Sequence, residues 1–421
     1  MKKMLSSRSW RVWLSSLAVG CWTMTGGQAL AQTLPEVYPP PTKPIQVPDG
    51  DLFYKQPDAA VLAGVVPGAV LRFREISAMA YFVLPMGGWA WQLMYRSNDT
   101  KGRPVGDVTT VIVPSNAPQK GRVLLSFQTA YDGLDQRCAA SQEVLRGTAD
   151  EASLILPALL KGWVVNLPDY EGPQAQWTAG INAGHGVLDS VRAATSFMQA
   201  GLDGMQTPVV MMGYSGGALA TTWATELHDG YAPEVNLRGV AVGGVPADLG
   251  SAGRHLDGGL LSGIYFAAVA GLARAYPEVD PQALFNDKGL RMLGNIGQMC
   301  VGQFMTGTWD PILAYAFQRM SRYTKVPQLL DVPVVQRILA ENKLGQRIPS
   351  VPMYIYQATL DELIPIQGVD QLVRTYCSGG AQIKYSRQLN EHIGLEITGY
   401  PAALAYLSDR IAGRPAPSSC F

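Results

Sequence analysis

Charge is scarce in this sequence, and neither sign is in excess. Charged side chains make up 16% of the 421 residues, against about 25% in a typical globular protein. Lys and Arg together number 33, and Asp and Glu also number 33, so the formal net charge is zero. This balance argues against nucleic acid or a strongly charged substrate as a partner. Hydrophobic residues amount to 47%, which favours an enzyme with a large core and an apolar working surface.

The sequence also lacks the patterns that bind metals and nucleotides. Its four histidines and five cysteines form no group with the spacing of metal ligands. No predicted strand is followed by a phosphate-binding loop of the Rossmann or P-loop kind. We therefore expect neither a metal nor a cofactor.

No apolar run is long enough to cross a membrane. The first 31 residues combine a basic start, an apolar stretch at 13–24 and the small-residue motif Ala29-Leu30-Ala31. This arrangement predicts a secretory signal peptide that is cleaved near Ala31, and hence a secreted protein, extracellular or periplasmic. A lipoprotein site at Cys21 is the less favoured alternative, because Ala18 stands where leucine is expected.

Cysteine use fits export. Once Cys21 leaves with the signal peptide, four cysteines remain, and in an exported protein four cysteines suggest two disulfides. The sequence permits three pairings. We favour Cys138–Cys300 and Cys377–Cys420, of which the second would pin the C-terminal tail to the domain. The alternative is free, buried thiols.

Predicted strands and helices alternate through most of the chain, which favours a parallel sheet with helices on both faces. Residues 32–50 form a Pro-rich leader, and the following strands, up to residue 113, are expected to be antiparallel. The core would span 51–248 and resume at 351–421. Between these parts, 249–350 contains only helical patterns; this predicts a cap or lid, because a plain crossover needs only about a dozen residues. The later strands are expected at 122–127, 163–167, 209–212, 237–242, 351–357 and 382–389, and the helices at 152–160, 186–199, 264–274, 281–285, 311–320, 333–341, 371–377 and 400–411.

One stretch carries a specific chemical signal. An apolar strand at 209–212 runs into Gly213-Tyr214-Ser215-Gly216-Gly217, and a small-residue helix follows. A Gly-x-Ser-x-Gly motif between a strand and a helix is the nucleophile elbow of an α/β-hydrolase. The glycines make room for a strained turn, and the helix N-terminus favours developing negative charge near Ser215. The alternative is a glycine-rich turn that happens to contain serine.

A nucleophilic serine needs an imidazole base and a carboxylate. His392 follows the last predicted strand, where this fold places its base, and we predict that it serves Ser215. Asp361 follows the penultimate strand and is the predicted acid, with Glu362 as the fallback. A histidine or an acid in a plain surface turn is the alternative for each. The remaining histidines lie on the elbow helix, in the cap or ahead of the nucleophile strand: His228, His255 and His185.

An oxyanion hole needs two donors. The backbone N–H of Gly216, which follows the nucleophile, is the first. The second should come from residues 128–133, but the usual His-Gly-Gly loop is missing there. Asp132 is unusual in that loop, because an ionised carboxylate would repel the oxyanion. Either its backbone N–H is the donor, or its carboxyl is held protonated.

Several short motifs are spread along the chain: Tyr95-Arg96-Ser97 with Gly102, Thr109-Thr110-Val111, the loop 128–132, Gly213 to Ala218, Tyr231 to Glu234, Gly243 to Leu249, and the contexts of Asp361 and His392. With these motifs the sequence, from about Asp51 to Cys420, resembles the secretory lipases, the lipase A type of yeasts with bacterial relatives. This resemblance implies an α/β-hydrolase fold with a helical lid, a triad of Ser215, Asp361 and His392, and Asp132 with Gly216 at the oxyanion hole. It also implies disulfides like those favoured above.

Together these features predict a secreted serine carboxylester hydrolase, with a triacylglycerol lipase favoured and a lid that opens at a lipid–water interface. A short-chain esterase or a peptidase on the same fold is one alternative, because a fold does not fix the substrate. A non-catalytic binding protein is the other.

Overall fold

The computed structural model describes residues 34–41, 48–81, 84–300 and 314–420. The predicted signal peptide lies outside these residues. The first part of the helix expected at 311–320 lies outside them as well.

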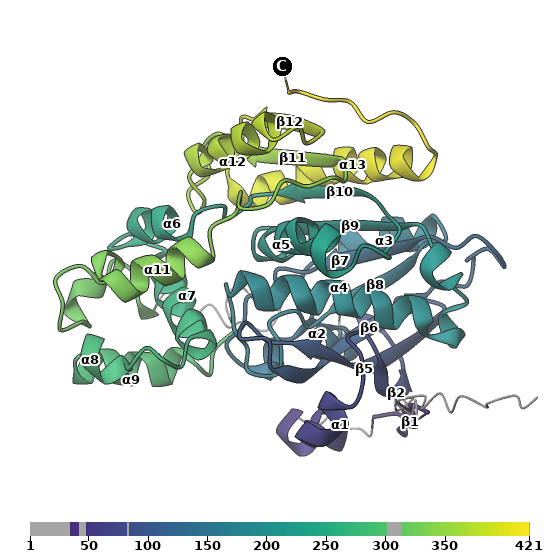
Figure 1. The fold of residues 1–421 in the computed structure, drawn as a ribbon, viewed down its shortest axis with the longest axis horizontal. Helices are drawn as coiled ribbons and strands as arrows, with labels where there is room; N and C mark the ends of the chain where they lie inside the picture. Colours follow the sequence, from purple (N-terminus) through teal and green to yellow (C-terminus); the bar gives the residue numbers. More distant parts are fainter. Residues whose placement is uncertain (1–33, 42–47, 82–83, 301–313, 421) are drawn as a thin grey trace, which may run out of the picture. The chain divides into compact units, whose positions relative to one another are not determined.

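A ten-stranded sheet forms the centre of the described chain, in the order β1-β2-β5-β6-β8-β7-β9-β10-β11-β12 (Figure 1). The pairings β2–β5, β5–β6 and β6–β8 are antiparallel, which agrees with the expected leading strands. The other pairings are parallel. The strands are β1 (Glu36–Val37), β2 (Val70–Ile76), β5 (Trp89–Asn98), β6 (Pro104–Val113), β7 (Leu124–Gln128), β8 (Val164–Pro168), β9 (Val209–Tyr214), β10 (Leu237–Gly243), β11 (Met353–Ala358) and β12 (Ile383–Gln388); β3 (Met79–Ala80) and β4 (Leu84–Pro85) form a small separate pair.

Helices pack on this sheet and bury its strands. All residues of β7, β8, β9 and β11 are buried, as expected for parallel strands that are covered on both faces. Two helices, α4 and α5, lie side by side in front of the sheet, and α3 contacts α13 (Figure 1). The helices of this part are α1 (Ala59–Ala63), α2 (Ala140–Arg146), α3 (Ala152–Leu160), α4 (Gly180–Ser196), α5 (Gly216–Tyr231), α12 (Ile366–Ser378) and α13 (His392–Ile411).

Between β10 and β11 the described residues form helices and turns. A second apolar core, built around Tyr265, Phe266, Met292 and Tyr323, holds these helices together. We call this part the cap. Its helices are α6 (Leu249–Leu256), α7 (Ser262–Ala275), α8 (Pro281–Leu284), α9 (Asp287–Ile296) and α11 (Pro333–Glu341).

Both disulfides have the pairing favoured from the sequence. Cys377 is bonded to Cys420 and ties the C-terminal tail to α12. Cys138 is bonded to Cys300 and ties the segment after β7 to the cap. Gly133 forms an isolated β-bridge with Cys300, next to the Cys138–Cys300 disulfide. The cap is therefore attached close to Asp132.

The last helix is longer than the sequence predicts: the prediction is 400–411, and the structure has His392–Ile411. In the structure, α13 begins at His392 and contains Pro401 within it. Proline is favoured in the first turn of a helix, but Pro401 stands inside α13. The earlier start is stabilised by Glu391, whose carboxylate accepts hydrogen bonds from the N–H groups of Ile393 and Gly394. Sequence periodicity also missed α2, α6 and α9.

Candidate active site

Ser215 sits in a strained turn between β9 and α5. Its backbone has φ 50° and ψ −118°, an unfavourable region for a residue with a side chain. The turn is possible because a Cβ on Gly213 would lie 2.4 Å from the carbonyl oxygen of Gly217, and one on Gly217 would lie 1.9 Å from that of Gln128. Only glycine fits at either position. The turn leaves Ser215 partly exposed at the start of α5, with the positive end of the helix dipole next to it.

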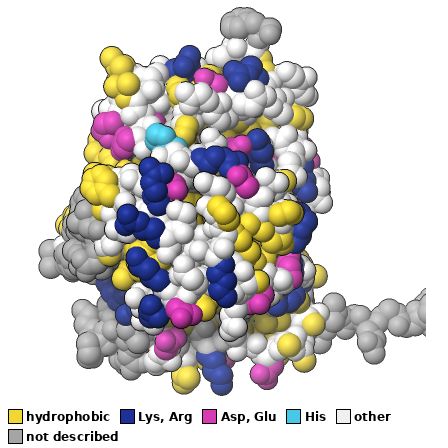
Figure 2. Space-filling model, turned by 90° about the vertical axis from the view of Figure 1, so that its left-hand side faces the viewer, with side chains coloured by type: hydrophobic (Ala, Val, Ile, Leu, Met, Phe, Trp, Pro, Cys, Tyr) yellow, Lys and Arg dark blue, Asp and Glu magenta, His cyan; other side chains and the backbone are white. Residues whose placement is uncertain are grey.

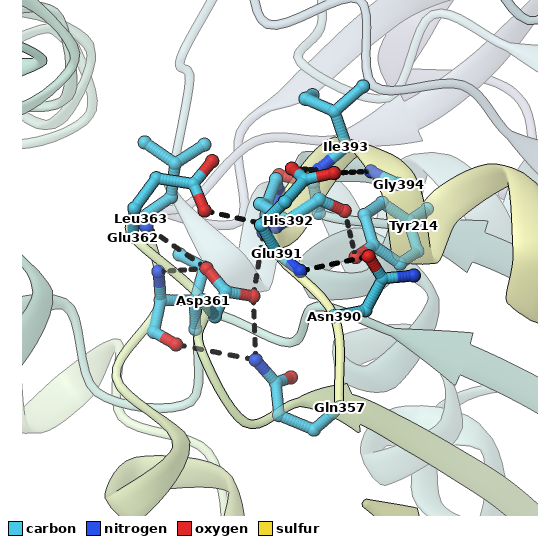
Figure 3. Close-up of polar contacts among 12 residues, drawn as sticks. Tyr214, Gln357, Asp361, Glu362, Leu363, Asn390, Glu391, His392, Ile393 and Gly394 are labelled. Atoms are coloured by element: carbon cyan, nitrogen blue, oxygen red, sulfur yellow. Dashed lines mark hydrogen bonds and ion pairs between the residues drawn. The ribbon is translucent and has the colours of Figure 1, made fainter. Parts of the chain in front are cut away.

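Ser215, His392 and Asp361 form one chain of hydrogen bonds. The Nε2 atom of His392 is 2.9 Å from the Oγ atom of Ser215. On the other side of the ring, Nδ1 is 2.8 Å from Oδ2 of Asp361 (Figure 3). Ser215, His392 and Asp361 follow β9, β12 and β11, respectively. These strands are far apart in sequence, but they run parallel in the sheet, so their C-terminal ends lie on the same side of it. With a proton on Nδ1, Nε2 is free to accept the serine proton.

Asp361 is held in a single orientation. Its Oδ1 atom accepts hydrogen bonds from the backbone N–H groups of Leu363 (3.0 Å) and Ile364 (2.7 Å). Its Oδ2 atom accepts from the Gln357 side-chain amide at 2.8 Å, in addition to His392 (Figure 3). The Asp361 side chain is 1% exposed. These contacts fix the Asp361 carboxyl group against the imidazole ring.

His392 is fixed through its backbone as well as its ring. Its N–H donates to the Glu362 carboxylate at 3.0 Å, and its carbonyl accepts from the Tyr214 hydroxyl at 2.6 Å. Glu362, the fallback acid, therefore contacts the backbone of His392 while Asp361 contacts the ring. The other histidines have different partners: the His228 ring contacts the carbonyl of Val235, the His255 ring contacts that of Glu362, and the His185 ring stacks on Tyr231.

Asp132 lies directly against Gly216. A Cβ on Gly216 would be 1.8 Å from Oδ1 of Asp132 and 3.1 Å from Oδ2, so the carboxyl covers the first residue of α5. Asp132 has φ 35°, another strained backbone. The indole N–H of Trp177 donates to Oδ1 at 2.9 Å. Both oxygens of the Asp132 carboxyl therefore lie close to the residue that follows Ser215.

Two backbone donors of the loop that contains Asp132 are occupied. The N–H of Ala130 donates to the Glu151 carboxyl group at 3.2 Å. The N–H of Gly133 donates to the Glu171 carboxyl group at 3.3 Å. These two N–H groups are therefore not available to an oxyanion.

Burial raises the pKa of Asp132 from 3.8 to about 6, and the nearby Glu396 carboxylate adds to this effect. The hydrogen bond from Trp177 and the proximity of His392 act in the opposite direction and lower the pKa. The carboxyl group is therefore substantially protonated in mildly acidic solution, and a protonated carboxyl group can donate a hydrogen bond to an oxyanion.

Among the residues that the structure describes, no three His, Cys, Asp or Glu side chains are grouped in a way that could hold a metal ion. In the same part of the chain, no helix is both long and apolar enough to span a bilayer.

Sequence reasoning missed the residues that support the site. Gln357 is a polar residue in the otherwise apolar β11, and that contrast is a signal that could have marked it. Trp177, Glu151 and Glu171 lie in loops or at helix ends and carry no motif. Their roles follow only from contacts with Asp132 and its neighbours.

Comparison with known proteins identifies a family of lipases. A family model described as "Secretory lipase" matches residues 140–419. A Mycobacterium tuberculosis protein named "Probable inactive lipase MT1628" is 36% identical over 382 residues, which cover 88% of this chain and 83% of that protein. The "Secreted triacylglycerol lipase LIP1" of Malassezia furfur is 31% identical over 393 residues, covering 88% of this chain and 78% of that protein.

Among solved structures, Candida antarctica lipase A superimposes with a TM-score of 0.81 at 29% identity, covering 89% of each chain. The sheet order, the strand–serine–helix turn and this similarity give the fold class as α/β-hydrolase, a mostly parallel sheet with helices packed against it.

Proposed function

The chain belongs to the secretory lipase family, and from that premise we propose that it is an exported serine carboxylester hydrolase acting on acylglycerols. The observation that supports this most is the hydrogen-bonded chain from Ser215 through His392 to Asp361. The secreted relative supports export, and the predicted signal peptide agrees with it.

In the proposed reaction, the Ser215 hydroxyl attacks the ester carbonyl while His392 takes its proton. Asp361 orients the imidazole and stabilises its charged form. The oxyanion accepts hydrogen bonds from the N–H of Gly216 and from Asp132. His392 then protonates the leaving alcohol, an acyl-enzyme remains on Ser215, and a water molecule activated by His392 releases the acid.

The cap supports a lipid-like substrate. A cavity of about 70 Å³ inside it is lined by apolar side chains of α6, α7, α8 and α11. Leu260 and Phe317 are 51% and 67% exposed on cap loops. Figure 2 shows the side of the molecule on which the cap helices lie in Figure 1: basic and acidic side chains are mixed there, with apolar groups between them. We propose that the cap acts as a lid. Its apolar surface would bind a lipid–water interface, and this binding would not depend on strong charge.

A series of nitrophenyl esters of increasing chain length tests the substrate class, with a peptide substrate measured beside it. We expect ester hydrolysis that rises sharply once a long-chain substrate exceeds its solubility, and none with Ser215→Ala. Rates that saturate smoothly would argue against an interfacial lid. Preference for the shortest esters would favour the esterase alternative, and cleavage of the peptide alone would favour the peptidase.

A non-catalytic role is the second candidate, because one relative is named as probably inactive. Labelling with a fluorophosphonate separates the two. An active nucleophile gives a covalent adduct at Ser215 that Ser215→Ala lacks, whereas a binding protein gives no adduct with either.

A further inference from the structure

We propose that Trp177 is a positioning residue of the oxyanion hole. Its indole N–H occupies Oδ1 of Asp132, and this leaves Oδ2 as the oxygen that carries the proton and donates it to the oxyanion. The inference rests on the proposed ester hydrolysis and adds to it a residue that assigns the proton to one atom.

The contact is short and enclosed. The Nε1 atom of Trp177 is 2.9 Å from Oδ1 of Asp132, and Trp177 is 5% exposed. An indole N–H can only donate. In a neutral carboxyl group the carbonyl oxygen is a stronger acceptor than the hydroxyl oxygen. The indole donor at Oδ1 therefore favours the form in which Oδ1 is the carbonyl oxygen and Oδ2 carries the proton.

The cap holds Trp177 from behind. Helix α7 lies against its backbone so closely that a Cβ on Gly271 would be 2.4 Å from the Trp177 carbonyl oxygen and 2.9 Å from its Cβ. The flanking residues Ala175 and Thr178 both have positive φ, 46° and 64°. The strained turn around Trp177, with α7 packed against it, restricts the directions that the indole ring can take. The cap therefore packs against the backbone that carries the donor of Asp132.

Burial and the nearby Glu396 carboxylate on α13 favour the neutral form of Asp132. Glu171 and the Tyr170 hydroxyl, in the segment after β8, also lie near Asp132, and an ionised Asp132 raises their pKa values. His392 is the group nearby whose charged form would favour ionisation. The hydrogen bond from Trp177 also lowers the pKa, so removing it should raise the pKa of Asp132 above about 6.

Asp132→Asn tests the assignment directly. With Trp177 present, the amide oxygen must accept from the indole, and the NH₂ group then stands in place of the Oδ2 hydroxyl. We expect this variant to keep kcat within about tenfold of wild type, and to keep it as the pH rises through 6, where wild type loses its donor. Asp132→Ala should lose about 10²- to 10³-fold in kcat.

Trp177→Phe removes the donor and keeps an aromatic ring. In the wild-type background we expect kcat to fall about 10- to 100-fold with little change in KM, and the loss of activity at high pH to move to higher pH. In the Asp132→Asn background the amide is free to flip, and its activity should fall again. Trp223→Phe is the matched control, because Trp223 is fully buried and its indole N–H has no hydrogen-bond partner; we expect less than about threefold change.

A measurement without catalysis makes the outcome decisive even if Trp177→Phe does not fold. The indole N–H resonance of Trp177 should titrate with an inflection near pH 6 in wild type and stay constant in Asp132→Asn. A resonance that ignores pH in wild type, or Asp132→Asn losing activity as fully as Asp132→Ala, overturns the proposal. A titrating resonance in a protein without esterase activity would remove the proposed function and leave the proton assignment standing.

Discussion

Replacing Asp361 by Asn should abolish most catalysis and leave the fold intact. The structure predicts the orientation of the new amide. Two backbone N–H groups, from Leu363 and Ile364, converge on Oδ1, so the amide oxygen must remain there. The NH₂ group is then forced to face Nδ1 of His392, which can only accept from it. The imidazole proton moves to Nε2, and the ring can no longer accept the proton of Ser215.

The local structure should tolerate this change. Gln357 now donates to Oδ2 of Asp361, and its own Oε1 is buried with no hydrogen-bond partner. A flip of the Gln357 amide would present Oε1 to the new NH₂ group and would give up the hydrogen bond that Nε2 now donates to the Ile364 carbonyl at 3.3 Å. The net change is about one neutral hydrogen bond, on the order of 1 kcal/mol in the free energy of unfolding.

The catalytic cost is much larger. A serine hydrolase whose histidine is held in the wrong tautomer loses about 10³- to 10⁴-fold in kcat, or about 4 to 5.5 kcal/mol of transition-state stabilisation. We would measure kcat/KM on a soluble nitrophenyl ester, the rate of fluorophosphonate labelling and the melting temperature. Both rates should fall together while the melting temperature shifts by only a few degrees.

Glu362→Gln is the control for this experiment. The Glu362 carboxylate accepts the backbone N–H of His392, and a glutamine oxygen can do the same, so activity should stay within about threefold. The reasoning is refuted if Asp361→Asn keeps more than a tenth of the wild-type rate, and above all if Glu362→Gln is the variant that loses activity.

Two further predictions concern stability. Opening Cys377–Cys420, which closes a 43-residue separation, should lower the free energy of unfolding by up to about 4 kcal/mol in a chemical unfolding experiment and leave kcat unchanged. Opening Cys138–Cys300 should also lower kcat, because that bond anchors the loop of Asp132. Equal effects of the two changes on kcat would contradict this. Burial raises the pKa of Asp169 from 3.8 to about 7, so the folded state binds that proton more tightly than the unfolded state, and stability should fall as pH rises from about 4 to 7. Asp169→Asn should flatten this slope, and an unchanged slope would show that Asp169 does not cause it.

Chain order and residue type were enough to predict the triad candidates. Serine in a glycine-flanked turn, an acid after the penultimate strand and a histidine after the last one follow from how parallel strands end at a common edge. The structure brings Ser215, Asp361 and His392 within hydrogen-bonding distance there. The start of α13 was not predicted in the same way. It depends on a local contact, in which the Glu391 carboxylate accepts hydrogen bonds from the first N–H groups of the helix.

Most of the supporting residues could not be predicted, because their contacts join residues that are distant in sequence. Trp177 and Asp132 are 45 positions apart, and only the folded chain brings the indole and the carboxyl together. Gln357 became recognisable as a support for Asp361 only once the turn after β11 was known. Periodicity describes how one element meets the core, and it carries no information on which two loops meet each other.

Two acidic residues, Glu151 and Glu171, lie against the loop that contains Asp132. Burial, together with the charge of Asp132, raises the pKa of Glu171, and burial with Glu396 raises that of Glu151. These carboxyl groups hold the two ends of the loop that contains Asp132. A carboxyl group surrounded by other acids in an apolar setting favours its neutral form. Burial and Glu396 raise the pKa of Asp132 in the same way, and in the proposed reaction a neutral Asp132 beside Gly216 would be the donor.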